Sequence, residues 1–236
     1  IFFLGFRYKH LKLLKEYNFI WKIKDEILLR KMTKYLISVK MPDIKKKYVY
    51  CPLYLMPETG TLLKGNDYMN QAFYVELVSK NIPSNCKLYV KEHPGMFTSH
   101  ARKIEFYKRI NLLPNVELVP IYADGMKLIK NSKLVVVVDG SSGFEAMLAK
   151  KPLVTFTYFV FSFLGLTVTN NNINDLYNDI QKAININLAV KPKQFEKKIK
   201  SLIIAISKTC HQLTKPGFSF SMKNSMMKIR KFVEKI

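Results

Sequence analysis

Residues 134–148 read Leu-Val-Val-Val-Val-Asp-Gly-Ser-Ser-Gly-Phe-Glu-Ala-Met-Leu. The first five residues form an uninterrupted apolar run, which is typical of a strand that is buried on both faces of a parallel sheet. The Asp-Gly-Ser-Ser-Gly segment predicts a turn, and residues 144–148 have the composition of a helix. We therefore expect a buried strand that passes through a glycine-serine turn into a helix.

The same alternation of short apolar runs and amphipathic stretches continues on both sides of this unit. Apolar runs predict strands at residues 48–53, 87–91, 116–119, 134–138 and 153–156. Helical spacing predicts helices around residues 72–78, at about 99–111, after the N-cap residue Asp124 and at 144–148. Strands that alternate with helices indicate an α/β fold, here a Rossmann-like parallel sheet with helices on both faces.

Changes in the hydrophobic and charge pattern divide the chain into three segments. Residues 1–45 contain a basic helical stretch at 10–37 and read as a linker or the remnant of another domain. Residues 46–190 carry the predicted Rossmann-like domain. The domain ends with a predicted helix at 173–185. Residues 191–236 read as basic C-terminal helices, with helical spacing predicted at 194–208 and 221–235.

The composition is that of a globular protein with a large positive charge. Among 236 residues, 39 Lys and Arg oppose 17 Asp and Glu, which gives a formal net charge of +22, and 48% of the residues are hydrophobic. This balance excludes a wholly disordered chain and a collagen. The positive charge favours anionic ligands or an anionic membrane face. Nucleic acid is not an expected partner, because no helix-turn-helix, zinc-finger or RNP-type pattern accompanies the lysines.

Two further absences bear on the class of protein. The three cysteines are too few and too scattered for a disulfide framework, and no His, Cys or acidic residues show the spacing of metal ligands, so no metal is expected. Residues 152–174 contain no charged residue, but they are rich in threonine, aromatic and β-branched residues, which predicts a buried strand and an aromatic loop rather than a membrane span. We expect a soluble, cytoplasmic protein.

The turn between the central strand and its helix is a candidate anion site. Gly140 and Gly143 permit a close approach of the backbone, and Ser141 and Ser142 add two hydroxyl groups at the start of the helix. Unpaired N–H groups and the helix dipole favour a phosphate there, with Glu145 able to accept hydrogen bonds from a ribose diol. The alternative is that a serine caps the helix and Glu145 completes a capping box.

A second candidate is the pair His93-Pro94, at the carboxyl end of the strand 87–91. Ligands of open α/β sheets bind outside the carboxyl ends of the strands, and Pro94 restricts His93 to an extended backbone. The imidazole could then donate to a phosphate or act as an acid. The alternative is a structural bond to a neighbouring backbone carbonyl, and we interpret Lys91 and Glu92 as solvated charges at the strand end.

A third candidate is Glu58, in the polar loop 57–61 after the first strand of the domain. Its carboxylate could contact a sugar hydroxyl or serve as a base. An ordinary loop charge is an equally good interpretation of the same residue.

Taken in order, these segments resemble the capsule polysaccharide biosynthesis family of bacterial surface-carbohydrate glycosyltransferases. The resemblance covers about residues 45–175 and is carried by residues 48–53, 57–61, 88–94, 106–107, 113–116, 118–120, 128–132, 140–146 and 151–152. It implies the C-terminal, donor-binding half of a GT-B glycosyltransferase. It also implies a nucleotide-sugar donor, with a CMP-sugar such as CMP-Kdo favoured, and no further cofactor.

The resemblance implies roles for individual residues. His93 with Pro94, Gly140, Ser141, Ser142 and Gly143 would hold the CMP phosphate, Glu145 would face the ribose or cytosine, and Glu58 would face the same cleft. His93 and Glu58 are the candidate catalytic residues. The implied acceptor is a lipid-linked or growing polysaccharide at the inner face of the cytoplasmic membrane, where the basic helices would contact anionic lipid.

Some features depart from the family pattern. Met56 stands where a glutamine is expected, Asp139 stands where a small polar residue is common, and fewer than fifty residues precede the domain where an acceptor domain should lie. Two other functions stay open: a sugar-nucleotide epimerase of similar shape, and a non-catalytic module of a polysaccharide biosynthesis complex.

Overall fold

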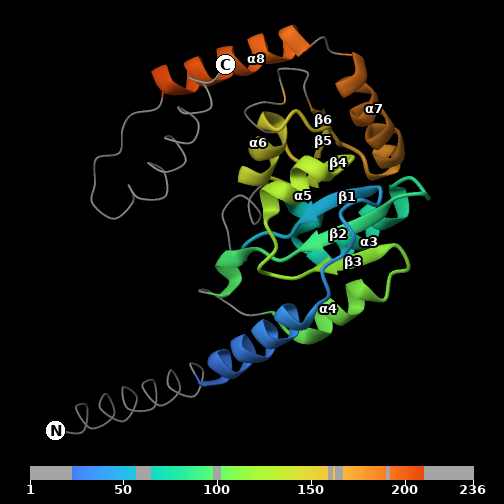
Figure 1. Cartoon of the computed structure of the whole chain (residues 1–236), viewed down its shortest axis with the longest axis vertical. Coiled ribbons are helices and arrows are strands. Elements are labelled where there is room, and N and C mark those ends of the chain that lie inside the picture. Colours follow the sequence, from blue (N-terminus) through green and yellow to red (C-terminus); the bar gives the residue numbers. More distant parts are fainter. Residues whose placement is uncertain are drawn as a thin grey trace, which may run out of the picture.

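A central parallel sheet organises the protein (Figure 1). The computed structural model describes residues 23–56, 65–97, 102–158, 162, 167–189 and 192–209. Within them six strands pair in parallel in the order β3-β2-β1-β4-β5-β6. Their bounds are Tyr48–Pro52 (β1), Lys87–Lys91 (β2), Val116–Val119 (β3), Leu134–Val137 (β4), Leu153–Thr155 (β5) and Val168–Thr169 (β6).

The strand order confirms the Rossmann-like fold class. From β1 the chain adds β2 and β3 on one side, then returns to place β4 on the other side of β1. The order therefore reverses between β1 and β4, which is the point where open α/β sheets bind their ligands. Both central strands are buried along their whole length, as the valine-rich run of β4 predicts.

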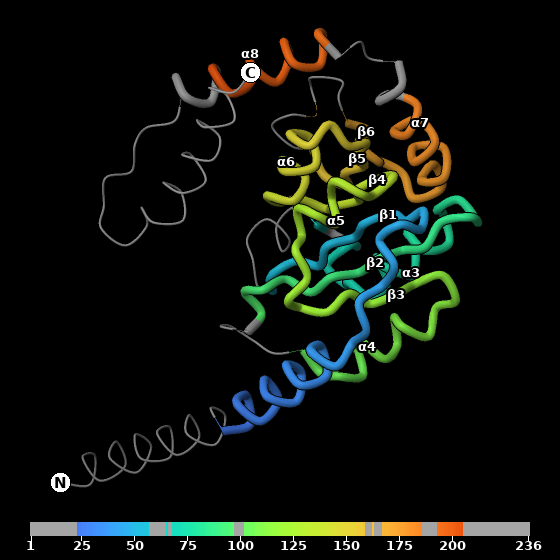
Figure 2. The backbone as a smooth tube through the Cα atoms, in the orientation of Figure 1, coloured from blue at the N-terminus to red at the C-terminus, as the bar shows by residue number. Residues whose placement is uncertain are grey.

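Helices cover both faces of the sheet, and Figure 2 traces the chain between the two layers. One layer contains the helix over residues 23–38 and the helices Gln71–Asn81 (α3), Ile104–Asn111 (α4) and Leu176–Ala189 (α7), whose buried side chains form one apolar cluster. The other layer contains Gly125–Asn131 (α5), Ser141–Leu148 (α6) and Pro192–Thr209 (α8), which form the second cluster. Single turns lie at Asn66–Met69 (η1), Pro94–Phe97 (η2) and Ile173–Asp175 (η4).

The helices agree in position with the sequence pattern wherever they are described. The carboxylate of Asp124 accepts the N–H groups of Met126 and Lys127 at 2.8 and 3.2 Å, which confirms it as the N-cap of α5. The predicted helix at 221–235 lies outside the described residues. In the part of the chain that is described, no helix has the length and apolar character needed to cross a membrane.

The last described helix, α8, packs onto the sheet domain. Phe195, Ile199, Leu202 and Ile203 are between 3% and 9% exposed and join the cluster beneath α5 and α6. The division of the chain at residue 190 stays a prediction, but the apolar face of α8 is part of the core.

Tyr54 links the two central strands where they diverge. Its hydroxyl accepts the main-chain N–H of Val138, just after β4, at 2.8 Å. The main chain of Tyr54 is in turn fixed by Gln71 of α3, whose amide oxygen accepts the Tyr54 N–H at 2.9 Å and whose amide nitrogen donates to the Tyr54 carbonyl at 3.2 Å. Both Tyr54 and Gln71 are buried.

We predict that Tyr54→Phe lowers the free energy of unfolding by about 1–3 kcal/mol, because the buried N–H of Val138 loses its acceptor. Urea unfolding followed by circular dichroism measures the change. The matched control is Tyr122→Phe, since the Tyr122 side chain is 67% exposed and its hydroxyl can bond to water. Equal unfolding free energies for Tyr54→Phe and the wild type would refute the link between the strands.

Candidate functional site

A cleft of about 800 Å³ lies at the carboxyl ends of β1 and β2. It is bordered by the exit of β1, the exit of β2, helix α5 and the first turns of α6. Because α6 follows β4, the cleft extends across the point between β1 and β4 where the strand order reverses. The polar and charged residues in its lining are Tyr50, Lys91, Glu92, His93, Lys130, Ser141, Ser142 and Glu145, of which Glu92 has no exposed side-chain surface.

The cleft brings together two motifs that lie almost fifty residues apart in the sequence. His93 and Pro94 from the exit of β2 line the same cleft as Ser141, Ser142 and Glu145 from α6. Their common location is what an anion site between the imidazole and the helix start requires.

The remaining predicted residues have other positions. Gly140 and Gly143 belong to the turn and the first turn of α6, and neither lines the cleft. Glu58 and the loop 57–61 lie outside the described residues.

The start of α6 has no side-chain cap. The N-cap residue is Gly140, with φ 106° and ψ 179°, a conformation that is essentially restricted to glycine. Ser141 and Ser142 therefore lie inside the first turn and neither caps it, so the alternative of a serine cap with Glu145 in a capping box is wrong. The positive end of the helix dipole, together with the Ser141 and Ser142 N–H groups that have no helical carbonyl to bond, favours an anion here.

The imidazole of His93 is fixed by its own turn. Its Nδ1 accepts the main-chain N–H of Gly95 at 3.0 Å, and the Met96 N–H donates to the His93 carbonyl at 3.0 Å. Because Nδ1 accepts a hydrogen bond, the neutral ring carries its proton on Nε2. His93 thus has the tautomer in which Nε2 is a donor.

Glycine at position 95 is required by this contact. A Cβ atom added to Gly95 would lie 2.9 Å from the Nδ1 of His93, closer than real Cβ contacts come, and 3.1 Å from its Cε1, a tight contact. Any larger residue would push the imidazole out of its observed place. The Gly after His93-Pro94 therefore belongs to the site.

The interpretation of Lys91 and Glu92 as solvated charges is wrong. Lys91 is 6% exposed and Glu92 is 2% exposed, because both lie where the strand end is still covered by α5 and the chain before α4. Burial lowers the pKa of the Lys91 ammonium, although the carboxylates of Glu92 and Asp124 oppose part of this shift. A buried ammonium in the wall of the cleft adds to its attraction for anions.

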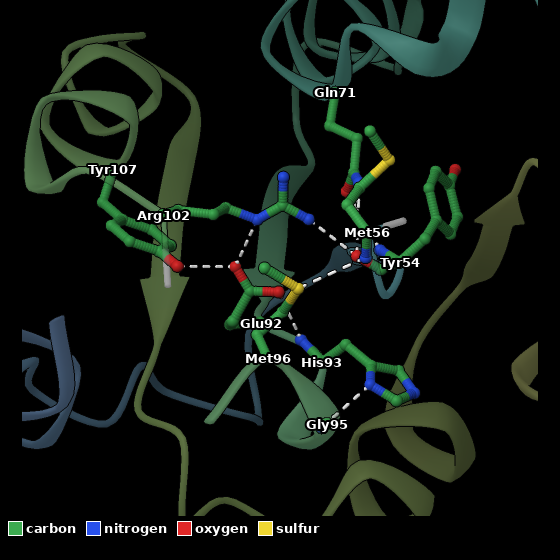
Figure 3. A network of polar contacts seen from close by, with 9 residues as sticks. All are labelled: Tyr54, Met56, Gln71, Glu92, His93, Gly95, Met96, Arg102 and Tyr107. Carbon is green, nitrogen blue, oxygen red and sulfur yellow. Dashed lines mark hydrogen bonds and ion pairs between the residues drawn. The ribbon is translucent and has the colours of Figure 1, made fainter. Parts of the chain in front are cut away.

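The carboxylate of Glu92 is the centre of a buried network (Figure 3). Its Oε2 accepts the Nε–H of Arg102 at 2.8 Å and the hydroxyl of Tyr107 at 2.6 Å, and its Oε1 accepts the main-chain N–H of His93 at 2.7 Å. Arg102 also donates from Nη2 to the carbonyl of Tyr54 at 2.6 Å. Burial and the adjacent carboxylate raise the pKa of Tyr107, so its hydroxyl keeps its proton and stays a donor.

The described residues contain no group of three or more His, Cys, Asp or Glu side chains that could hold a metal ion. The expectation that the site needs no metal stays a prediction.

Comparison with known proteins finds one family whose sequence profile matches this chain. The sequence profile of the family described as "Capsule polysaccharide biosynthesis protein" matches residues 45–192. That span includes all six strands and every residue of the cleft named above. No curated protein sequence matches the chain.

Solved structures resemble the chain at low sequence identity. Two are from Thermosulfurimonas dismutans KpsC: the beta Kdo 2,4 transferase, with 16% identity and a TM-score of 0.42, and the beta Kdo 2,7 transferase, with 15% and 0.43. A third is the Methanocaldococcus jannaschii UDP-GlcNAc 2-epimerase in complex with UDP-GlcNAc and UDP, with 15% and 0.39. The matches cover 66%, 70% and 77% of this chain, which spans only 54%, 62% and 51% of those chains.

We predict that Gly95→Ala displaces the His93 ring and removes its preference for the Nε2–H tautomer, because the added methyl group occupies the space of Nδ1. Nitrogen-15 NMR of the imidazole measures the tautomer directly. The matched control is Gly125→Ala, where the added Cβ would lie 3.6 Å from the Tyr50 hydroxyl, an ordinary contact. An unchanged His93 spectrum in Gly95→Ala would show that the turn does not orient the ring.

Proposed function

The chain belongs to the capsule polysaccharide biosynthesis protein family, and from this premise we propose that it binds the donor nucleotide-sugar of a glycosyltransferase. The donor we favour is a CMP-sugar of the CMP-Kdo type. The sheet domain would be the C-terminal, donor-binding half of a two-domain GT-B enzyme, with the acceptor half supplied by another part of the protein.

A single observation carries this proposal: the His93 imidazole and the uncapped start of α6 line one cleft at the reversal point of the sheet. A helix start, two hydroxyl groups and an Nε2–H donor are all suited to the oxygens of a phosphate. Lys91 adds a buried positive charge in the wall of the same cleft. The cleft therefore suits a nucleotide better than a neutral sugar.

The proposed chemistry follows from where charge develops. An acceptor hydroxyl attacks the anomeric carbon of the sugar, the bond from that carbon to the phosphate oxygen breaks, and its electron pair leaves with the nucleoside monophosphate. The departing phosphate then carries a greater negative charge than it does in the donor. The His93 ring, already oriented by its turn, would stabilise this charge together with the hydroxyl groups of Ser141 and Ser142.

Other roles in the site follow from position. Glu145 lies one turn inside α6 and lines the cleft, where its carboxylate can accept hydrogen bonds from the ribose hydroxyls. Glu58, in the loop after β1, is the candidate base for the acceptor hydroxyl. Deprotonation of the acceptor would otherwise depend on the acceptor half.

The acceptor and the cellular location are parts of the same proposal. A lipid-linked or growing polysaccharide would be the acceptor, at the cytoplasmic face of the membrane. Lys193, Lys197 and Lys198 of α8 are exposed while the apolar side of the helix is buried. Contact with anionic lipid through α8 would therefore be electrostatic rather than insertion of an apolar face.

We predict that His93→Ala weakens CMP binding by roughly 5- to 150-fold, about 1–3 kcal/mol, because a charge-assisted hydrogen bond to the phosphate is lost. Ser141→Ala with Ser142→Ala should also weaken CMP. Titration calorimetry with CMP, CMP-Kdo, UDP and cytidine measures these affinities. Cytidine lacks the phosphate, so its affinity should not respond to either change.

The matched control for the serines is Ser201→Ala in α8, an exposed helical serine whose hydroxyl donates only to the Lys197 carbonyl of its own helix. It should bind CMP like the wild type. Binding of UDP without CMP would favour the epimerase alternative, and binding of no nucleotide would favour a non-catalytic module.

We also predict that CMP binding takes up a proton at alkaline pH. Burial lowers the pKa of Lys91 below its ordinary 10.5, and a bound anion stabilises the ammonium and raises that pKa again. The complex therefore holds the proton in a window below the ordinary pKa of 10.5 in which the free protein loses it, and CMP affinity falls as the pH rises through that window.

Calorimetry in two buffers of different ionisation enthalpy measures the uptake. Lys91→Met should abolish it and weaken CMP, whereas Lys127→Met, which removes an exposed lysine of α5 outside the cleft wall, should change neither. Equal proton uptake in the wild type and Lys91→Met would exclude Lys91 from the anion site.

A further inference from the structure

The carboxylate of Glu92 makes all its described contacts inside the protein. Its side chain has no exposed surface, and the Arg102 side chain that pairs with it is 13% exposed. Arg102 and Tyr107 bind one oxygen, and the main-chain N–H of His93 binds the other. These partners leave Glu92 a poor candidate for a group that touches a bound nucleotide.

A buried ion pair of this kind contributes little to stability compared with apolar residues of the same size, because both charges lose their hydration. What it does provide is a fixed geometry. Arg102 joins the exit of β1, through the Tyr54 carbonyl, to the exit of β2, through Glu92, and its guanidinium lies 5.0 Å from the ring centre of Phe106. Glu92 is thus held from three segments of the chain.

This fixed geometry also constrains His93, the next residue in the chain. Its N–H is held by Glu92, its carbonyl accepts the Met96 N–H, and its Nδ1 accepts the Gly95 N–H. In Figure 3 the imidazole points away from Glu92 while the main-chain N–H points toward it. The backbone of the turn is therefore anchored on the buried carboxylate. The imidazole ring projects from this turn, and its Nε2–H is the ring donor on the side away from the turn.

We propose that Glu92, supported by Arg102 and Tyr107, is a positioning residue for His93: it fixes the turn from which the imidazole reaches the anion in the cleft. This inference rests on the proposed function for the identity of the anion, the phosphate of a nucleotide. Glu92 borders the cleft, but its side chain has no exposed surface, so it would act on the donor only through His93.

The test is a double-mutant cycle with a variant designed to fold. Glu92→Met combined with Arg102→Met removes both charges together, so neither is left buried without its partner. We expect roughly tenfold weaker CMP binding by calorimetry, because the turn loses its anchor. In the His93→Ala background the same pair of changes should have no further effect, since the residue through which Glu92 acts is already absent.

Two comparisons separate positioning from a general structural role. Glu92→Gln keeps an oxygen that can accept the His93 N–H, so it should restore CMP affinity to within about threefold of the wild type. Glu76→Met with Arg109→Met removes the same charges from an exposed ion pair of α3 and α4 and should leave CMP affinity unchanged.

Nitrogen-15 NMR of His93 gives a readout that needs no ligand. The Glu92→Met, Arg102→Met protein should show a mixture of imidazole tautomers, whereas Glu92→Gln should keep the Nε2–H form. If that double variant does not fold, Tyr107→Phe, which removes only one hydrogen bond to the carboxylate, takes its place, and a shift of the tautomer ratio is again expected.

Additive effects of Glu92 and His93 in the cycle would overturn the proposal, because they would mean that Glu92 acts independently of the imidazole. An unchanged tautomer in the Glu92→Met, Arg102→Met protein, or in Tyr107→Phe where that variant replaces it, would also overturn the proposal. If the wild type binds no nucleotide, the proposed function fails, while the NMR experiment still decides whether Glu92 positions His93.

Discussion

The hydrogen bond from the Val138 N–H to the Tyr54 hydroxyl holds β1 and β4 together at the point where their chains separate. All strands of a parallel sheet end at the same edge, but only where the strand order reverses do the following loops turn in opposite directions and leave an opening. The start of α6 follows β4 at this point, and the His93 turn follows β2, the strand on the other side of β1. Their proximity depends on this local closure of the sheet more than on any direct contact between them.

Much of this fold is readable in the sequence because the pattern is strong and local. The run Leu134–Val138 predicted a buried strand, and the glycine-serine turn after it predicted the helix, both of which the structure contains. His93 was found because a proline follows it at a strand end. Such signals depend on neighbouring residues, and neighbours in sequence remain neighbours in the structure.

The Glu92 network could not be predicted from the sequence, because its members come from distant segments. Nothing beside Arg102 or Tyr107 in the sequence indicates a partner ten or fifteen residues earlier, and a Lys-Glu pair at a strand end is normally solvated. The burial that makes these charges significant is a property of the assembled layers. Gly95 is a similar case, because its contact with the imidazole becomes evident only from the coordinates.

The packing of α8 has a consequence for how the chain reaches its folded state. The residues of α5 and α6 that face α8 with their apolar side chains are synthesised before α8. The helix that covers them is the last described element to leave the ribosome. Until then a nascent chain displays that surface to its surroundings, where it can associate with other unfinished chains or with chaperones. Synthesis that stops before Phe195 would leave the strand order intact and one wall of the molecule uncovered.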